Sequence, residues 1–295
     1  MTVQQQNITF KSQGVTCRGL FFRADRDGKA PCVLLAHGFC GTIEMRLKDY
    51  AEAFALAGYH AMVFDYRHFG ISDGNPRQIL DIKKQHQDWR AAIAHARTLD
   101  GVDPRRLILW GTSFSGGHVA VMASEDKNIA AVISQVPHIN GLATAMAVGV
   151  AQNLRLGIVS FIDRVGAILG RPPFYVPALG RPGDLAAMTA PGEFEASRKL
   201  MPEGSVVDER VAARIFLSLA LYSPGRLASK ITMPWLVQVA LQDTTTPSKP
   251  TIAAAKKAPK GELITYPLGH FAVYVPPDFD QTIADQLAFL KKHVP

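Results

Sequence analysis

The stretch that most constrains the fold of this chain is residues 107–117, with the sequence LILWGTSFSGG. Its first four residues form a short apolar run that is typical of a buried strand, and small residues then surround Ser113. Residues 118–123 are apolar enough for a packed helix. A strand, a tight turn with a serine and a helix form the layout of a nucleophile elbow, in which the serine hydroxyl projects from the strand end. This layout requires small neighbours, because the strand and the helix pass close together.

Two serines compete for the position at the turn. Ser113 directly follows the strand and has Gly111 two residues before it, whereas Ser115 would fall inside the first helical turn. The geometry of an elbow therefore favours Ser113. Ser115 then stands two residues after the nucleophile, where glycine is usual, and is small enough for that place. The structural alternative is that Ser113 only caps the helix.

Strands and helices alternate through most of the chain, which predicts an α/β fold with a mostly parallel sheet covered by helices on both faces. An opening hairpin is expected at 7–12 and 15–23, because Gly14 separates two strand-like segments. Apart from the elbow strand, the further strands are predicted at 31–36, 60–65, 129–136, 234–240 and 262–266. Apart from the elbow helix, the helices are predicted at 43–57, 80–98, 247–258 and 278–292.

The alternation breaks between residues 137 and 230. This segment has helical apolar stretches and loops rich in Pro and Gly, and no convincing strand. We interpret 137–230 as a helical cap inserted over the carboxyl ends of the strands, and 1–136 with 231–295 as the core.

Two polar residues after the break complete a pattern with Ser113. Asp243 directly follows the strand 234–240, and His270 directly follows the strand 262–266. A serine hydroxyl needs a base to take its proton and a third group to orient that base. Because parallel strands open their carboxyl ends on one side, the order Ser, Asp, His past three strand ends predicts a catalytic triad.

Each member of this triad has another interpretation. Asp243 could cap the helix that begins near Pro247, and His270 could hold a backbone carbonyl in a loop. Asp65 also ends a strand and could supply the acid, but its neighbours Arg67 and Asp73 suggest a structural ion-pair turn.

An oxyanion hole requires two backbone N–H groups beside the nucleophile. The N–H of Phe114, the residue after Ser113, is one candidate. Phe39, in the loop after the strand 31–36, is the other, and Gly38 lets that backbone approach closely. Cys40 lies near this loop but has no evident base, so we treat it as a bystander. The sequence has no histidine spacing typical of a metal site, no phosphate loop and no dinucleotide fingerprint, so no cofactor is expected.

Composition and charge indicate which classes of binding partner are not expected. The net charge of +7 comes from scattered basic residues, without the basic runs and interleaved aromatics typical of nucleic-acid binding. The apolar region 141–170 is interrupted by Arg155, Asp163 and Arg164, which argues against a membrane span. Three cysteines without a framework and a polar first segment without a signal pattern favour a cytoplasmic location. We therefore expect neither a nucleic acid nor a membrane as partner.

Taken together, the motifs resemble the α/β-hydrolase superfamily over nearly the whole chain. The motifs are His37-Gly38-Phe39, FDYRHFGISDG at 64–74, GTSFSGG at 111–117, Asp243 and Gly269-His270. The sequences of the second and third motifs are similar to those of a group of bacterial and fungal esterase-like proteins. That group includes polyketide acyl-transferring members and relatives of the acetyl-xylan-esterase and dienelactone-hydrolase type.

The expected activity is that of a serine hydrolase. It would cleave a carboxylic ester or thioester of a small to medium apolar substrate, through an acyl-enzyme on Ser113 with His270 as base and Asp243 as its orienting acid. An acyltransferase that passes the acyl group to an alcohol or amine is one alternative, and an inactive binding protein with the same fold is another. The sequence leaves the natural substrate and the oligomeric state open, and a homodimer is compatible with it.

Overall fold

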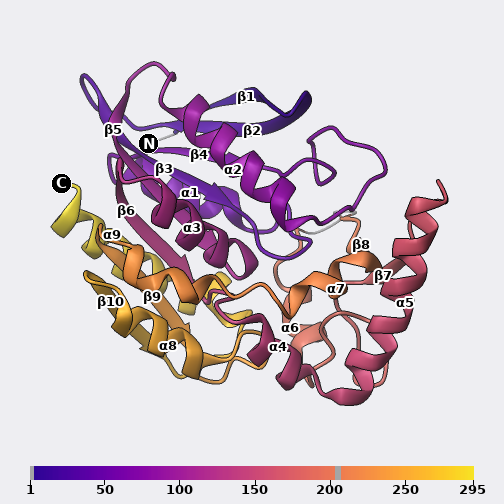
Figure 1. Ribbon diagram of the computed structural model, residues 1–295. Helices are drawn as coiled ribbons and strands as arrows, with labels where there is room; N and C mark the ends of the chain where they lie inside the picture. The colour runs from indigo at the N-terminus through magenta and orange to yellow at the C-terminus, as the bar shows by residue number, and fades with distance from the viewer. Residues whose placement is uncertain (1–2, 203–206) are drawn as a thin grey trace.

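A mostly parallel sheet forms the centre of the protein (Figure 1). The computed structural model describes residues 3–202 and 207–295, and within them the large sheet has eight strands in the order β1-β2-β4-β3-β5-β6-β9-β10. Their bounds are β1 Gln4–Ser12, β2 Val15–Arg23, β3 Ala30–Ala36, β4 His60–Phe64, β5 Val102–Thr112, β6 Ile129–Gln135, β9 Trp235–Ala240 and β10 Gly261–Tyr266.

Strand direction in this sheet agrees with the prediction. The strands from β4 to β10 pair in parallel, while the opening hairpin pairs β1 with β2, and β2 with β4, in antiparallel fashion. Strands β3 and β4 are buried along their full length, as expected for strands covered on both faces. The carboxyl ends of the parallel strands therefore meet at one edge of the sheet.

Helices cover both faces of the sheet (Figure 1). On one face, the apolar sides of α1 (Leu47–Leu56) and α9 (Asp278–His293) pack against the strands. On the other lie α2 (Ile82–Ala96), α3 (Phe114–Glu125) and α8 (Ser248–Lys257). Helix α1 begins four residues later than predicted, because Arg46 has a left-handed backbone with φ 70°.

The chain leaves the sheet after β6 and returns to it at β9. Between them lie α4 (Gly141–Val148), α5 (Val150–Ile168), α6 (Glu193–Arg198), α7 (Phe216–Leu219) and the 3-10 turns Ala213–Ile215 and Pro224–Lys230. A third 3-10 turn, Ala272–Tyr274, follows β10. In Figure 1 the inserted segment forms a separate layer beside the sheet, with α5 at its outer edge.

The prediction of no strand between residues 137 and 230 was wrong. Two short strands, β7 (Tyr175–Pro177) and β8 (Arg210–Ala212), pair in antiparallel fashion there. Each has three residues, too few for an alternating pattern to be recognised. The other regular elements described in the segment are helical and are joined by loops, but the division into a core of 1–136 and 231–295 and a cap of 137–230 stays a prediction. Residues 1–2 and 203–206 of these ranges lie outside the described residues.

Candidate active site

Ser113 occupies the single residue between strand β5 and helix α3. Its backbone has φ 53° and ψ −118°, a conformation that few non-glycine residues adopt and that typifies strained functional positions. Gly111 is needed for the turn, because a β-carbon there would lie 2.3 Å from the carbonyl oxygen of Ser115. Strand and helix therefore pass as closely as the sequence predicts.

The two competing serines have different surroundings. The Oγ of Ser113 lies 3.0 Å from Nε2 of His270. Ser115 is fully buried, and its Oγ is hydrogen-bonded to the hydroxyl of Tyr66 at 2.8 Å. Of the two, the structure brings Ser113 to the histidine.

His270 links Ser113 to Asp243. His270 and Asp243 stand in the loops after β10 and β9, and His270 Nδ1 donates to Asp243 Oδ2 at 2.6 Å. Since a carboxylate only accepts, Nδ1 carries the proton and Nε2 is free to accept from the hydroxyl of Ser113. The three predicted side chains thus form one continuous hydrogen-bonded chain. Such a chain can activate a serine for attack on a carbonyl carbon.

The environment of His270 sets its protonation. Burial on its own lowers the pKa of this imidazole, but the nearby Asp243 carboxylate and the hydrogen bond to it raise the pKa. Glu193 adds a smaller contribution in the same direction, and the net result is a pKa above the ordinary value. The carboxylate therefore stabilises the imidazolium that forms when His270 takes a proton.

Asp243 is held by the loop that follows it. The N–H groups of Thr245 and Thr246 donate to its Oδ1 at 2.8 and 2.6 Å, and the hydroxyl of Thr246 lies 2.7 Å from its Oδ2. The sequence analysis missed this role of Thr246. A short Asp-Thr-Thr-Thr segment in which side chains bond to backbone N–H groups is a recognisable turn signal.

The loop after β3 lies directly against the elbow. A β-carbon on Gly38 would come within 2.7 Å of Cβ and 3.2 Å of Oγ of Ser113. His37 Nδ1 donates to the Gly38 carbonyl oxygen at 3.0 Å, which turns that carbonyl toward the imidazole ring. In a trans peptide the C=O and N–H point in opposite directions, so the Phe39 N–H is directed away from His37.

Phe39 and Phe114, the predicted donors, are neighbours in the structure. Their rings meet edge to face with centroids 5.8 Å apart. Among the described residues, neither of their N–H groups donates to a backbone acceptor. The N–H of Phe114 is free because it opens helix α3, where the first N–H groups have no partner within the helix.

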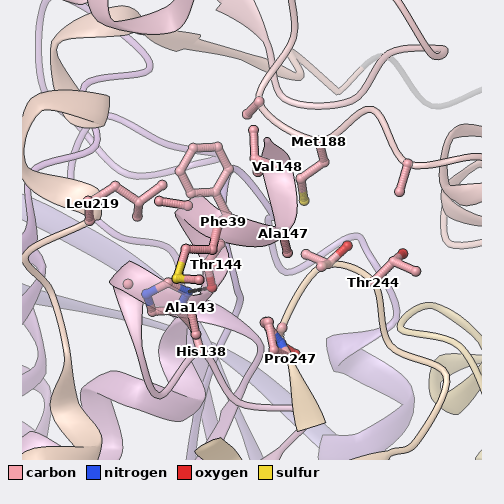
Figure 2. A pocket seen from close by; sticks show the side chains of 18 of the residues that line it. Phe39, His138, Ala143, Thr144, Ala147, Val148, Met188, Leu219, Thr244 and Pro247 are labelled. Atoms are coloured by element: carbon pink, nitrogen blue, oxygen red, sulfur yellow. Dashed lines mark hydrogen bonds between the residues drawn. The ribbon is translucent and has the colours of Figure 1, made fainter. Parts of the chain in front are cut away.

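A cavity of about 860 Å³ opens beside Ser113. Figure 2 shows Phe39 and Leu219 at one side of it and Thr244 and Pro247 at the other, with residues of α4 between them. Its lining is mostly apolar and comes from α4, α5, α7 and the loops after β3, β5, β6 and β9. The cavity is of a size that takes a small organic molecule.

Two ionisable residues near His270, His138 and Glu193, were not predicted from the sequence. His138 follows the end of β6, as Asp243 and His270 follow theirs, so its place past a strand end was the available signal. Burial lowers its pKa to about 4, and its Nε2 donates to the carbonyl of Tyr222 at 3.3 Å. Glu193, from the inserted segment, accepts from the hydroxyl of Thr244 at 2.6 Å. No sequence signal pointed to Glu193.

The interpretation of Asp65 as part of an ion-pair turn with its neighbours was wrong. Its carboxylate accepts from the N–H groups of Ile43 and Ile71 at 2.8 and 2.9 Å. The two neighbours pair elsewhere, in the salt bridges Arg67–Asp88 and Arg18–Asp73. Burial raises the pKa of Asp65 to about 6.

Cys17, Cys32 and Cys40 are free and buried, and burial raises the pKa of the Cys40 thiol. Within 3–202 and 207–295, no group of three or more His, Cys, Asp or Glu side chains is arranged to hold a metal ion.

Comparison with known proteins identifies the family. The sequence matches the family described as serine aminopeptidase, S33, over residues 28–270. This range contains Ser113, Asp243 and His270 together with the strands that precede them. The chain belongs to this family of α/β-hydrolases, and the predicted fold and superfamily are confirmed.

Individual relatives span nearly the whole chain. The quorum-quenching protein AidA of Acinetobacter baumannii (strain MDR-ZJ06) is 44% identical over 289 residues, which cover 98% of this chain and 95% of AidA. Polyketide transferase ATR5 of Stachybotrys chlorohalonatus (strain IBT 40285) is 25% identical over 296 residues, with 98% and 97% covered. The solved structure of DcsB in complex with its substrate analogue has a TM-score of 0.85 at 24% identity and covers 99% of both chains, which shows a shared fold.

Proposed function

We propose that this protein is a serine hydrolase that cleaves a carboxylic ester or thioester of a small to medium apolar substrate through an acyl-enzyme. The observation that carries the proposal is the hydrogen-bonded chain from Ser113 through His270 to Asp243, which ends at a mostly apolar cavity. Membership of the α/β-hydrolase family supports it. The serine, the base and the acid are the three parts that acyl transfer to a hydroxyl needs.

The reaction would proceed in two halves. Ser113 Oγ attacks the carbonyl carbon while His270 Nε2 takes its proton, and the N–H groups of Phe39 and Phe114 stabilise the oxyanion. The carbon–oxygen or carbon–sulfur bond then breaks, and His270 returns the proton to the departing alcohol or thiol. A water molecule, activated by the same imidazole, attacks the acyl-enzyme and releases the carboxylic acid with free Ser113.

The mostly apolar cavity supports an apolar acyl group or alcohol as substrate. Alanine, valine, methionine and leucine side chains of the inserted segment supply 11 of the 30 residues that line the cavity. The name of AidA describes removal of a signalling activity, so its substrates belong among those to test for this chain.

Acyl transfer is the second candidate. The similarity to polyketide transferase ATR5 covers 98% of this chain, and an acyl-enzyme is common to hydrolysis and to transfer. The outcome depends on whether water or an alcohol or amine reaches the acyl-enzyme first. Product analysis with and without an added acceptor distinguishes the two reactions.

The testing experiment compares wild type with Ser113→Ala and Ser115→Ala on p-nitrophenyl esters from acetate to dodecanoate, on a thioester and on a cyclic ester. Loss of the nucleophile should reduce turnover by about 10³–10⁶-fold for Ser113→Ala, whereas Ser115→Ala should stay active. Labelling by a fluorophosphonate probe should require Ser113. If wild type hydrolyses no ester and takes up no probe, the proposal is overturned in favour of an inactive binding protein. Loss of activity only in Ser115→Ala would overturn the choice of nucleophile.

A further inference from the structure

Helix α5 is unusual among the helices of this protein because large apolar side chains cover its outer face. Seven of its apolar residues and the residue after it form one stripe, from 38% to 88% exposed: Val150, Leu154, Ile158, Phe161, Ile162, Val165, Ile168 and Leu169. Their spacing of three and four residues places them on one side of the helix. In Figure 1 the helix lies at the outer edge of the inserted segment, away from the sheet. We call these residues the α5 stripe.

A surface stripe of this size needs a covering partner in most soluble proteins. The opposite side of α5 is already used, since Leu156, Ser160 and Asp163 are buried against the rest of the inserted segment. The α5 stripe is therefore a second face of the helix, which differs from the buried side because its apolar side chains are exposed to solvent.

Two arginines flank the stripe. At about 100° per residue, Arg155 falls roughly 90° to one side of its midline and Arg164 roughly 90° to the other. Arg155 donates to the carbonyl of Gly183 and to the side chain of Gln152. Among the described residues, the ion pairs of the inserted segment use other arginines: Arg181–Glu195, Arg198–Glu209, Arg210–Asp208 and Arg214–Asp163.

These charges argue against a second copy of the chain as the partner. If two α5 helices packed antiparallel across a two-fold axis, Arg155 of one would come opposite Arg164 of the other. The acidic residue of α5, Asp163, is buried and paired with Arg214, so α5 offers no exposed carboxylate to neutralise them. Apolar side chains bordered by arginines are instead the pattern of a helix that lies in the interface of an anionic membrane.

No single helix in the described residues is long and apolar enough to cross a membrane; the bent pair α4 and α5, with a 110° angle between them, meets the length and composition test only when taken together. A helix that lies on a surface needs no span. The charges within region 141–170 predict no membrane partner, but the exposure of the α5 stripe in the folded protein leads to a different conclusion.

We infer that the α5 stripe, with Arg155 and Arg164, docks the protein on the surface of an anionic phospholipid bilayer. The inner sides of α4 and α5 line the cavity, and Met146 is both 74% exposed and part of the cavity wall. Docking would bring the cavity next to the lipid, from which an apolar substrate could enter. The inference about docking stands on the surface alone and does not require the proposed reaction.

The test measures sedimentation of the purified protein with vesicles of phosphatidylcholine and phosphatidylglycerol in equal parts, and with vesicles of phosphatidylcholine alone. Wild type should bind the anionic vesicles more tightly. Neutralising both arginines, in Arg155→Gln/Arg164→Gln, should weaken that binding by about 30-fold, at roughly fivefold for each charge near the surface. Phe161→Gln should weaken it by at least about tenfold.

The matched control is Arg105→Gln/Lys260→Gln, which removes the same charge from two exposed residues at the opposite end of the strands. It should bind as wild type does, within about twofold. All variants replace exposed side chains, so their melting temperatures and their hydrolysis of p-nitrophenyl acetate without vesicles should match wild type.

Three results would overturn the inference. One is the absence of binding to anionic vesicles by wild type. Another is an equal loss in the control and in Arg155→Gln/Arg164→Gln, which would indicate general charge attraction. The last is a dimer in solution that Phe161→Gln converts to a monomer, since the stripe would then be an interface between two copies. A failure of ester hydrolysis would leave vesicle binding measurable, so the two proposals fail separately.

Discussion

Replacing Gly38 by alanine should impair catalysis far more than folding. The added β-carbon would lie 2.7 Å from Cβ of Ser113 and 3.2 Å from the Thr112 carbonyl oxygen. Carbon atoms in contact prefer about 3.5–4.0 Å, so the loop or the serine must move by about 1 Å. The φ of Gly38 lies outside the left-handed region, so the backbone itself accepts alanine.

The size of the effect follows from that displacement. A shift of about 1 Å in a catalytic group can cost about 100-fold in rate, and loss of one oxyanion donor costs about 10²–10³ in kcat. Gly38→Ala moves Phe39, the proposed donor, relative to Ser113. We therefore expect kcat/KM for p-nitrophenyl acetate to fall by at least about 100-fold, mainly through kcat, because an oxyanion donor stabilises the transition state more than the bound substrate.

Gly166→Ala is the matched control. A β-carbon on Gly166 meets only Cβ of Arg171, at 3.7 Å, and the residue lies in the last turn of helix α5 without a positive φ. Alanine is favoured over glycine there by roughly 0.5–1 kcal/mol, so this variant should be as active as wild type and equally or more stable. Both melting curves should be recorded with the kinetics. A folded Gly38→Ala protein with activity within about threefold of wild type would refute the placement of the oxyanion loop against Ser113.

Two further predictions concern the base and its acid. His270 acts as a base only when it is neutral, and the Asp243 carboxylate raises its pKa, so the imidazole loses its proton at a higher pH. We therefore expect kcat/KM to rise with pH about a midpoint above 6.5. A profile that is flat between about pH 6 and 8 would contradict His270 as base. Thr246→Val removes the hydroxyl that contacts Asp243 but keeps the backbone N–H donor, so kcat should fall by about tenfold and the midpoint of the pH profile should shift. Thr246→Ser should restore both kcat and the midpoint. Unchanged kinetics and an unchanged pH profile in Thr246→Val would show that the hydroxyl does not position the carboxylate.

The positions of Ser113, Asp243 and His270 were predictable because one rule governs all three. Each follows a strand of a parallel sheet, and the carboxyl ends of such strands meet at one edge, so contact in space follows from place in sequence. The same rule would have found His138 after β6, had every strand end been considered.

Contacts between distant segments were not predictable in this way. Arg67 pairs with Asp88, 21 residues away on helix α2, although Asp65 and Asp73 are nearer in sequence. Local spacing gives no information on which helix packs behind a loop. The exposure of the α5 stripe was not predictable for a related reason. The spacing of apolar residues along a helix is the same whether a protein core or solvent lies against that face.

The presence of Ser115 where an elbow usually has glycine can be explained from its contacts. The indole N–H of Trp89 donates to the hydroxyl of Tyr66 at 2.7 Å, which leaves the phenol proton available for Ser115 Oγ at 2.8 Å. Both aromatic residues are buried, and burial raises the pKa of Tyr66, so the phenol stays protonated as a donor. The small serine side chain thus points toward Tyr66 and ties the first turn of α3 to α2 through a fully satisfied buried chain. The Ser115 hydroxyl is thus held by Tyr66 and the Ser113 hydroxyl by His270, which supports Ser113 as the proposed nucleophile.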